Sequence, residues 1–302
     1  MRGNGQLVDS GVSALAPAIW GSTYLVTTEL LPPDRPLLAA TVRALPAGLL
    51  LLAMGRILPT GIWWWRALVL GTLNIGAFFV LLFVAAYRLP GGVAALIGSV
   101  QPMLVLVLAA LLLGDRIRLV HVLACLAGAV GVALLVLKST VGLDTIGVVA
   151  ALGGAVCMAS GIVLTKRWAR PVGLLLFTGW QLTAGGLVLL PVLLVFEGLP
   201  SSVNGTNVLG YLYLIVLGSL FGYSIWFRGV ERLPAVAVSF LGLTSPIVAT
   251  LLGFLFLHQT LSLLQLLGAA LIVGAIVKAQ LTPVRDKVDP NLLGPPAVAR
   301  TG

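Results

Sequence analysis

Arg43 has the most unusual setting of any functional side chain in this sequence, because it stands inside an apolar run that covers residues 36–55. If that run crosses a membrane, a charge about seven residues inside it is costly and usually faces a protein interior or a cavity. We therefore predict that Arg43 binds a carboxylate of the substrate. Two structural roles remain open: the side chain could extend back to the membrane surface, or it could pair with Glu29 and join two helices.

Amide and aromatic side chains recur in other apolar runs. Asn74 and Phe78 are four residues apart, which places them on one face of a helix, and Tyr223 stands in the corresponding run of the second half. Two such helices could line a pocket for an amphipathic solute, although an amide bond between packed helices would also explain Asn74. The same class of candidate binding residues includes Trp20, Tyr24, Trp180 and Gln181, of which Trp180 could instead face lipid.

Two prolines interrupt apolar runs beside hydrogen-bonding groups. Proline removes a backbone donor and disturbs the preceding helical turn, so carbonyl groups are freed near Pro102 and Pro246. These carbonyls and nearby side chains could bind the polar end of a substrate, and the kinks could act as hinges. A static kink satisfied by hydroxyl groups is the alternative. The neighbouring candidate binding residues are Ser99, Gln101, Thr244 and Ser245.

Titratable groups are missing from the middle of the apolar runs. The acidic residues stand in loops or near run ends, and so do His121 and His258. An antiporter that exchanges a cationic drug for protons needs a buried carboxylate, so that function is excluded. Cys125 and Cys157 stand inside apolar runs and suggest neither a disulfide nor a metal site. We therefore expect no metal, no cofactor and no proton coupling.

The composition indicates the class of protein to which these side chains belong. Of 302 residues, 59% are apolar and 9% are charged, and the mean hydropathy is +1.11. A soluble domain has about a quarter charged residues, because its surface must face water. The chain is therefore not a soluble enzyme and, being apolar throughout, not a disordered protein.

Ten apolar runs are each long enough to cross a bilayer as a helix, which takes about 20 residues. We expect an all-α polytopic membrane protein in which residues 1–10 form a cytoplasmic N-terminus and residues 281–302 a disordered cytoplasmic tail. The first run is too long for a cleaved signal peptide. The predicted spans are 11–31, 36–55, 67–87, 91–113, 117–137, 145–165, 172–196, 208–230, 235–257 and 262–280.

The basic residues predict the orientation of the chain. With the N-terminus inside, 14 of the 18 Lys and Arg residues fall in inner segments, and Arg43 falls within a span. The outer segments hold only Arg35, Arg88 and Lys138. Because cytoplasmic loops are enriched in basic residues, both termini are predicted to be cytoplasmic, in a bacterial inner membrane. The net charge of +9 then needs no nucleic acid to explain it, and the lipid bilayer is the expected partner.

The two halves of the sequence repeat each other. Arg88-Leu89-Pro90 recurs 144 residues later as Arg232-Leu233-Pro234. Offsets of 144 and 138 further relate Pro102 to Pro246, Gly98 to Gly242, and Gly48 to Gly186. The halves, residues 11–140 and 141–280, each have five predicted spans, so the copies enter the membrane in opposite orientations. Inverted repeats are typical of secondary transporters, whose substrate site lies where the repeats meet.

These features resemble a known family. Trp20-Gly21-Ser22-Thr23-Tyr24 is similar to the first-helix signature of the EamA-type, ten-helix drug/metabolite transporters, and the resemblance covers about residues 11–280. The other shared features are Arg43, Arg88-Leu89-Pro90, and the Gln101-Pro102 and Ser245-Pro246 kinks. The resemblance implies export of small metabolites by alternating access. Among members, the chain looks most like bacterial exporters of aromatic and other neutral amino acids.

The sequence therefore predicts an exporter of small amphipathic metabolites, most simply a monomer, in which two five-helix repeats rock around a central cavity. Arg43 or freed backbone groups would bind the polar end of the substrate, and aromatic side chains its apolar part. A carrier of nucleotide sugars or sugar phosphates has the same architecture, but more internal lysines would then be expected. A lipid-modifying enzyme would need clustered acidic or histidine residues, and a structural subunit would not need duplicated kinks. The Gly218–Gly222 face could mediate dimerisation, although contacts within the bundle explain it as well.

Overall fold

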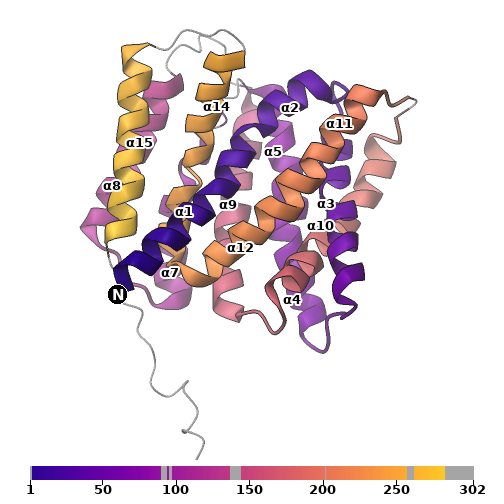
Figure 1. Cartoon of the computed structure of the whole chain (residues 1–302), viewed down its shortest axis with the longest axis horizontal. Coiled ribbons are helices and arrows are strands. Elements are labelled where there is room, and N and C mark those ends of the chain that lie inside the picture. Colours follow the sequence, from indigo (N-terminus) through magenta and orange to yellow (C-terminus); the bar gives the residue numbers. More distant parts are fainter. Residues whose placement is uncertain are drawn as a thin grey trace, which may run out of the picture.

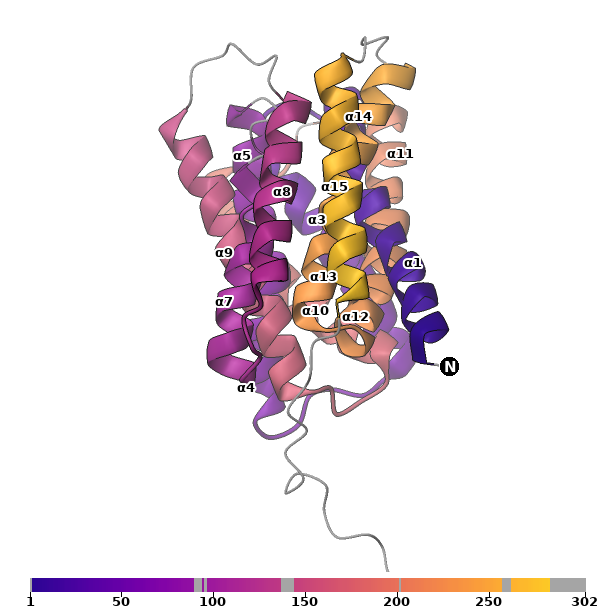
Figure 2. The ribbon, with the colours of Figure 1, turned by 90° about the vertical axis from the view of Figure 1, so that its left-hand side faces the viewer.

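The computed structural model describes residues 2–89, 94, 97–136, 144–200, 202–256 and 262–282 (Figure 1). Over these ranges the chain forms helices joined by short connections, packed side by side in one bundle (Figure 2). Seven helices in the described part are long and apolar enough to cross a membrane. The prediction of an all-α polytopic membrane protein is confirmed. Pro90, Lys138, His258 and the predicted tail beyond residue 282 lie outside the described residues.

The first half of the described chain forms five membrane-crossing stretches. The first is broken at Ser22, and the third passes through a short π-helix, η1, in which the helical turns are wider. The elements are α1 (Arg2–Gly21) and α2 (Thr23–Leu30), α3 (Pro36–Gly55), α4 (Trp63–Gly71) with η1 (Thr72–Gly76) and α5 (Ala77–Arg88), α7 (Gln101–Leu113), and α8 (Leu119–Val136).

The second half repeats this order within the described residues. A longer π-helix, η2, again interrupts the third stretch, and a turn before Pro246 again breaks the fourth. The elements are α9 (Thr145–Trp168), α10 (Leu174–Phe196), α11 (Gly205–Tyr213) with η2 (Leu214–Phe221) and α12 (Gly222–Arg232), α13 (Ala235–Leu241) with α14 (Thr244–Phe256), and α15 (Leu263–Leu281). These stretches match the ten predicted spans, although the first, third and eighth begin earlier than predicted.

Polar residues determine where several helices begin. Asp144 precedes α9 and its carboxylate accepts a hydrogen bond from the Gly147 N–H at 2.7 Å. This hydrogen bond, and then the positive charge of Arg88, holds the pKa of the Asp144 carboxyl below its usual value. Ser262 and Gln265 cap the first turn of α15 reciprocally. Such caps replace the backbone partners that the first helical turn lacks.

The two ends of the bundle can be told apart by the chain termini. Gln6 Nε2 donates to the Gln280 carbonyl at 2.9 Å, so α1 begins beside the end of α15, as an even number of crossings requires. We call this the terminal end, and the opposite end the distal end. The distal end carries the connections at residues 31–35 and 197–204.

Helices α3 and α10, the second stretch of each repeat, cross closely near their midpoints. Gly48 and Gly186, which the 138-residue offset relates, both lie at this crossing. A Cβ on Gly186 would lie 2.8 Å from Leu45 Cα, and one on Gly48 would overlap the backbone nitrogen of Thr183. The absence of side chains at these positions therefore lets the two backbones touch.

Candidate functional site

A cavity of about 510 Å³ lies in the distal half of the bundle. Most contributing stretches supply the part that is nearer the distal end. Tyr223 and Trp226 of α12 and Ser239 of α13 come from beyond the middle of their stretches, and the cavity ends near Trp20, Tyr223 and Trp226. A volume of this size lies in the range of small-molecule binding sites. Both repeats contribute to the lining, so the cavity lies where they meet.

Arg43 lines this cavity and is 2% exposed. Its Nη2 donates to the Gly218 carbonyl at 3.3 Å, and its guanidinium carbon lies 4.7 Å from the centre of the Phe79 ring. The Nε hydrogen has no acceptor, and no ion pair to Arg43 exists among the described residues. Glu29 is exposed. Arg43 thus neither extends to the membrane surface nor pairs with Glu29.

The π-helix η2 supplies the acceptor that holds Arg43. The Gly218 carbonyl also accepts a hydrogen bond from Trp20 Nε1, at 2.8 Å. A Cβ on Gly218 would lie 3.4 Å from Arg43 Nε, and a Cβ on Gly222 would lie 2.9 Å from Trp20 Nε1. Side chains from within the bundle therefore pack against both glycines of the GxxxG face.

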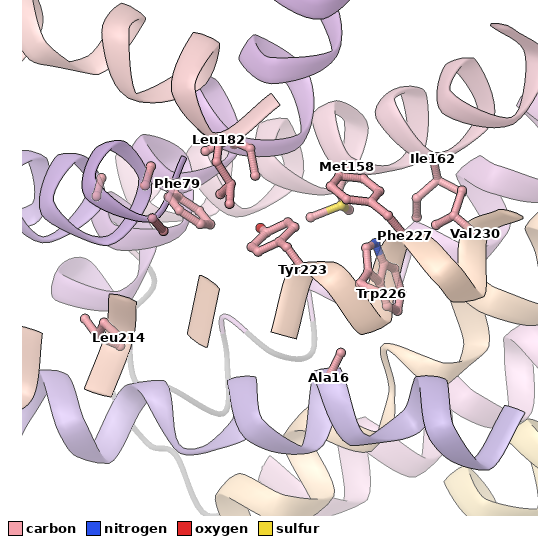
Figure 3. Packing of buried hydrophobic residues seen from close by; sticks show 14 of the residues in the cluster. Ala16, Phe79, Met158, Ile162, Leu182, Leu214, Tyr223, Trp226, Phe227 and Val230 are labelled. Carbon is pink, nitrogen blue, oxygen red and sulfur yellow. The ribbon is translucent and has the colours of Figure 1, made fainter. Parts of the chain in front are cut away.

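Aromatic rings form the floor of the cavity. The Trp20 ring lies 4.9 Å from the Tyr223 ring and 5.2 Å from the Trp226 ring. The Phe79 ring also contacts Tyr223, and Figure 3 shows Phe79, Tyr223 and Trp226. Trp226 is 1% exposed, and its Nε1 has no hydrogen-bond partner. Ring pairs at such distances are stabilising beyond their buried area. The floor is thus apolar, and one indole N–H in it has no partner.

Small side chains of α9 line another part of the cavity. Ala150, Ala151, Gly154 and Ala155 all contribute, followed by Met158 toward the floor. This stretch has almost no side-chain bulk, so it leaves room for an apolar group of a ligand. Phe78, a predicted site residue, also lines the cavity.

The two proline kinks also reach the cavity. Ser99, Gln101 and Pro102 line it from the first repeat, and Ser245 and Pro246 from the second. In both repeats the helix stops just before the kink: residues 99–100 and 242–243 form turns. Thr244 is not among the lining residues.

Asn74, Gln181 and Trp180 lie elsewhere in the bundle. Asn74 Nδ2 donates to Gln181 Oε1 at 2.7 Å and to Thr165 Oγ1 at 3.2 Å, and both amides are fully buried. This is the amide contact between helices that the sequence left open as an alternative. Trp180 is 4% exposed and donates to the Ile57 carbonyl at 2.8 Å. None of the three lines the cavity.

Several residues that line the cavity were not predicted from the sequence. Thr23, Thr27 and Tyr87 line the cavity, and the hydroxyl groups of the two threonines are buried and have no partner. The spacing of Trp20, Thr23 and Thr27 is that of one helix face, and this signal could have identified the two threonines. The side chain of Tyr24, a predicted site residue, lies outside the described part of the structure.

Charged side chains tie the helices together at the terminal end. Asp9 Oδ1 lies 2.6 Å from Arg228 Nη2 and 3.3 Å from Arg232 Nη1, which joins α1 to α12. Arg170 Nη2 lies 2.9 Å from Glu231 Oε1, and Lys166 Nζ donates to the Leu233 carbonyl at 2.7 Å. We call these contacts the terminal-end ties. They converge on residues 228–233 and close the bundle below the cavity floor.

The electrostatics of the cavity favour an anion. Arg43 is the one charged residue in the described lining, and no carboxylate faces it there. A buried cation without a counter-ion is costly, and a ligand carboxylate would remove that cost through charge-assisted hydrogen bonds. The site can therefore bind an anionic group at Arg43 and an apolar group among the rings.

Comparison with known proteins agrees with this architecture. The family model described as EamA-like transporter family matches residues 11–137 and again residues 145–278, one match for each repeat. Protein PecM of Dickeya dadantii (strain 3937) is 52% identical over 91% of this chain and 94% of its own length. The uncharacterized inner membrane transporter YedA of Escherichia coli (strain K12) is 29% identical over 86% of each chain.

A solved structure has the same fold. It superposes with a TM-score of 0.76 at 23% identity, over 90% of this chain and 96% of the other. From the family match and the duplicated architecture, the chain belongs to the EamA-like transporter family and is a secondary transporter of the membrane, not an enzyme.

Proposed function

We propose that this protein exports small amphipathic metabolites that carry a carboxylate, and that its substrates are amino acids with aromatic or other neutral side chains. The observation that carries the proposal is Arg43, a buried cation that lines the cavity and has no ion pair in the described chain. A substrate carboxylate would complete its hydrogen bonding, including the free Nε donor. Specific recognition of a carboxylate is a common role of a guanidinium group.

The remainder of the cavity supports an apolar group on the same substrate. The Trp20, Tyr223 and Trp226 rings would pack against it, and the small side chains of α9 leave space beside them. A carrier of sugar phosphates would be expected to have lysines at its site, and no lysine lines the described part of the cavity. These features favour amino acids over nucleotide sugars and sugar phosphates.

The orientation that the basic residues predict places the distal end outside the cell and both termini in the cytoplasm. The cavity would then face outward, and the terminal-end ties would close the cytoplasmic side. Alternating access would convert this state into one with the reverse accessibility. A monomer suffices for this cycle, because both repeats that form the cavity belong to one chain.

A binding and counterflow screen tests the proposal. The purified protein is mixed with phenylalanine, leucine, phenylalanine amide, glucose 6-phosphate and UDP-glucose, and its melting temperature is recorded. The same solutes are then tried in counterflow with proteoliposomes. We expect stabilisation and counterflow with the two amino acids only. Stabilisation by the sugar compounds alone, or an equal response to phenylalanine and its amide, would contradict the proposal.

A further inference from the structure

Two threonine hydroxyls in the cavity have no hydrogen-bond partner. Thr23 is 7% exposed and Thr27 is 8% exposed, and the Oγ1 atom of each is buried without an acceptor or a donor nearby. Both residues line the cavity. A buried hydroxyl without a partner is destabilising, so a ligand that bonds to it recovers free energy.

Several other helical hydroxyls in this protein bond to their own helix. Those of Thr41, Thr178, Ser224 and Thr250 each donate to the carbonyl four residues earlier, at 2.5–2.9 Å. This is the usual bond for a serine or threonine in a membrane helix. The hydroxyls of Thr23, Thr27, Thr183 and Ser219 make no such bond, and of these four residues only Thr23 and Thr27 are in the described lining of the cavity.

The break in the first stretch explains why Thr23 differs. The carbonyl four residues before Thr23 belongs to Ile19, and it already accepts hydrogen bonds from the Ser22 N–H and hydroxyl, at 3.1 and 2.6 Å. Thr23 thus starts a new helix with its default acceptor occupied. Thr27 follows one turn later on the same face.

Trp20, Thr23 and Thr27 all line the cavity, and the Trp20 ring reaches the Arg43 site. Trp20 Nε1 and Arg43 Nη2 share the Gly218 carbonyl, at 2.8 and 3.3 Å, so those two nitrogens are close together. Thr23 follows Trp20 by three residues, across the break at Ser22. The polar strip of Thr23 and Thr27 therefore runs from the guanidinium toward the distal end.

We infer that Thr23 and Thr27 form a second subsite, which binds the ammonium group of a substrate whose carboxylate binds Arg43. The inference rests on the proposed function and makes the site selective for zwitterions over simple organic acids. An ammonium group brings three donors and needs acceptors. No carboxylate is available in the described lining, whereas each hydroxyl oxygen has lone pairs free.

The test compares phenylalanine with 3-phenylpropionate, which has the same ring and carboxylate but no ammonium group. Thr23→Val and Thr27→Val keep the shape of the side chain and remove the hydroxyl. We expect each variant to bind phenylalanine about tenfold more weakly, while its affinity for 3-phenylpropionate changes by less than about twofold. Thr41→Val is the matched control, because Thr41 is equally buried, bonds to Leu37 and does not line the cavity.

Thr23→Ser and Thr27→Ser retain the hydroxyl and should bind phenylalanine like the wild type, which separates a lost hydrogen bond from a packing defect. Equal losses for both ligands in the valine variants, or no loss, would overturn the second subsite while leaving the proposed function intact. If the wild-type protein binds 3-phenylpropionate but not phenylalanine, the amino-acid function fails, and the ammonium subsite fails with it.

Discussion

Phe79 and Tyr223 occupy equivalent positions in the two repeats, 144 residues apart, and their rings touch at a centroid distance of 5.8 Å. A residue can contact its own counterpart only where the axis that relates the repeats passes. This pair therefore marks the axis at the cavity floor. The guanidinium of Arg43, 4.7 Å from the Phe79 ring, lies beside it.

A second pair of equivalent contacts shows where the repeats differ. Arg43 corresponds to Gln181 at an offset of 138, and Gly218 corresponds to Asn74 at an offset of 144. Arg43 bonds to the Gly218 backbone, and Gln181 bonds to the Asn74 side chain. The first contact leaves a cation facing the cavity, whereas the second is neutral and fully buried. The two repeats therefore share their helical architecture but differ at these positions, where only the first repeat has a charged residue, Arg43.

Replacing Arg43 tests the carboxylate site. Arg43→Gln should weaken binding of free amino acids by about tenfold to a hundredfold, because a hydrogen-bonded ion pair is lost. Binding of the corresponding esters or amides should change little. Isothermal titration with both ligand types measures this. Arg116→Gln, at an exposed position outside the cavity, serves as the control. An equal loss for acids and esters would assign Arg43 a structural role.

Transport should not depend on a proton gradient. Proton coupling needs a buried group that titrates, and the described cavity lining contains no acidic residue and no histidine. Uptake by proteoliposomes, with and without an imposed pH gradient at zero membrane potential, measures this. We expect equal final levels of substrate. Accumulation above equilibrium driven by the pH gradient alone would refute uncoupled transport.

Weakening the terminal-end ties should favour opening at that end. Asp9→Asn removes the charge that Arg228 and Arg232 share, and all three side chains are partly exposed, so we expect a shift of about twofold to fivefold. The reporter is Val230→Cys in a chain with Cys125 and Cys157 replaced by Ala, because Val230 is fully buried. Its labelling rate with a membrane-impermeant maleimide added from the terminal side should rise. Glu29→Gln, at the distal end of the first stretch, should leave the rate unchanged.

The helix crossing should not tolerate a methyl group. Gly186→Ala would place Cβ 2.8 Å from Leu45 Cα, and overpacking of this kind costs about 1–3 kcal/mol. The melting temperature in detergent should fall by several degrees. Gly274→Ala is the matched control, because a Cβ there meets no atom within 4 Å. An unchanged melting temperature for both variants would show that the crossing adapts.

The basic residues predict the topology. Reporter fusions after residues 61, 142 and 302 should read inside, outside and inside, because connections rich in arginine and lysine stay in the cytoplasm. Alkaline phosphatase and green fluorescent protein report the two compartments. An outside reading after residue 302 would contradict the even number of crossings.

Hydropathy, repeat offsets and prolines were sufficient to predict the ten stretches and both kinks, because each of these signals can be read along the sequence without knowing which helices pack together. The partners of Asn74 were not predictable in the same way. Its helix is apolar on most faces, so periodicity does not say which face meets α10. The free hydroxyl of Thr23 depends on a helix break one residue earlier, where Ser22 takes the Ile19 carbonyl. Such competition for one acceptor is visible only in three dimensions.

The close crossing of α3 and α10 has a mechanical consequence. At Gly48 and Gly186 the two backbones touch, so neither can slide along or separate from the other without losing that contact. Rotation about the point of contact remains possible. When a helix rotates about a fixed point of contact, its two ends move in opposite directions. Opening of the bundle at one end would therefore close it at the other end, without a further conformational change that links the two ends.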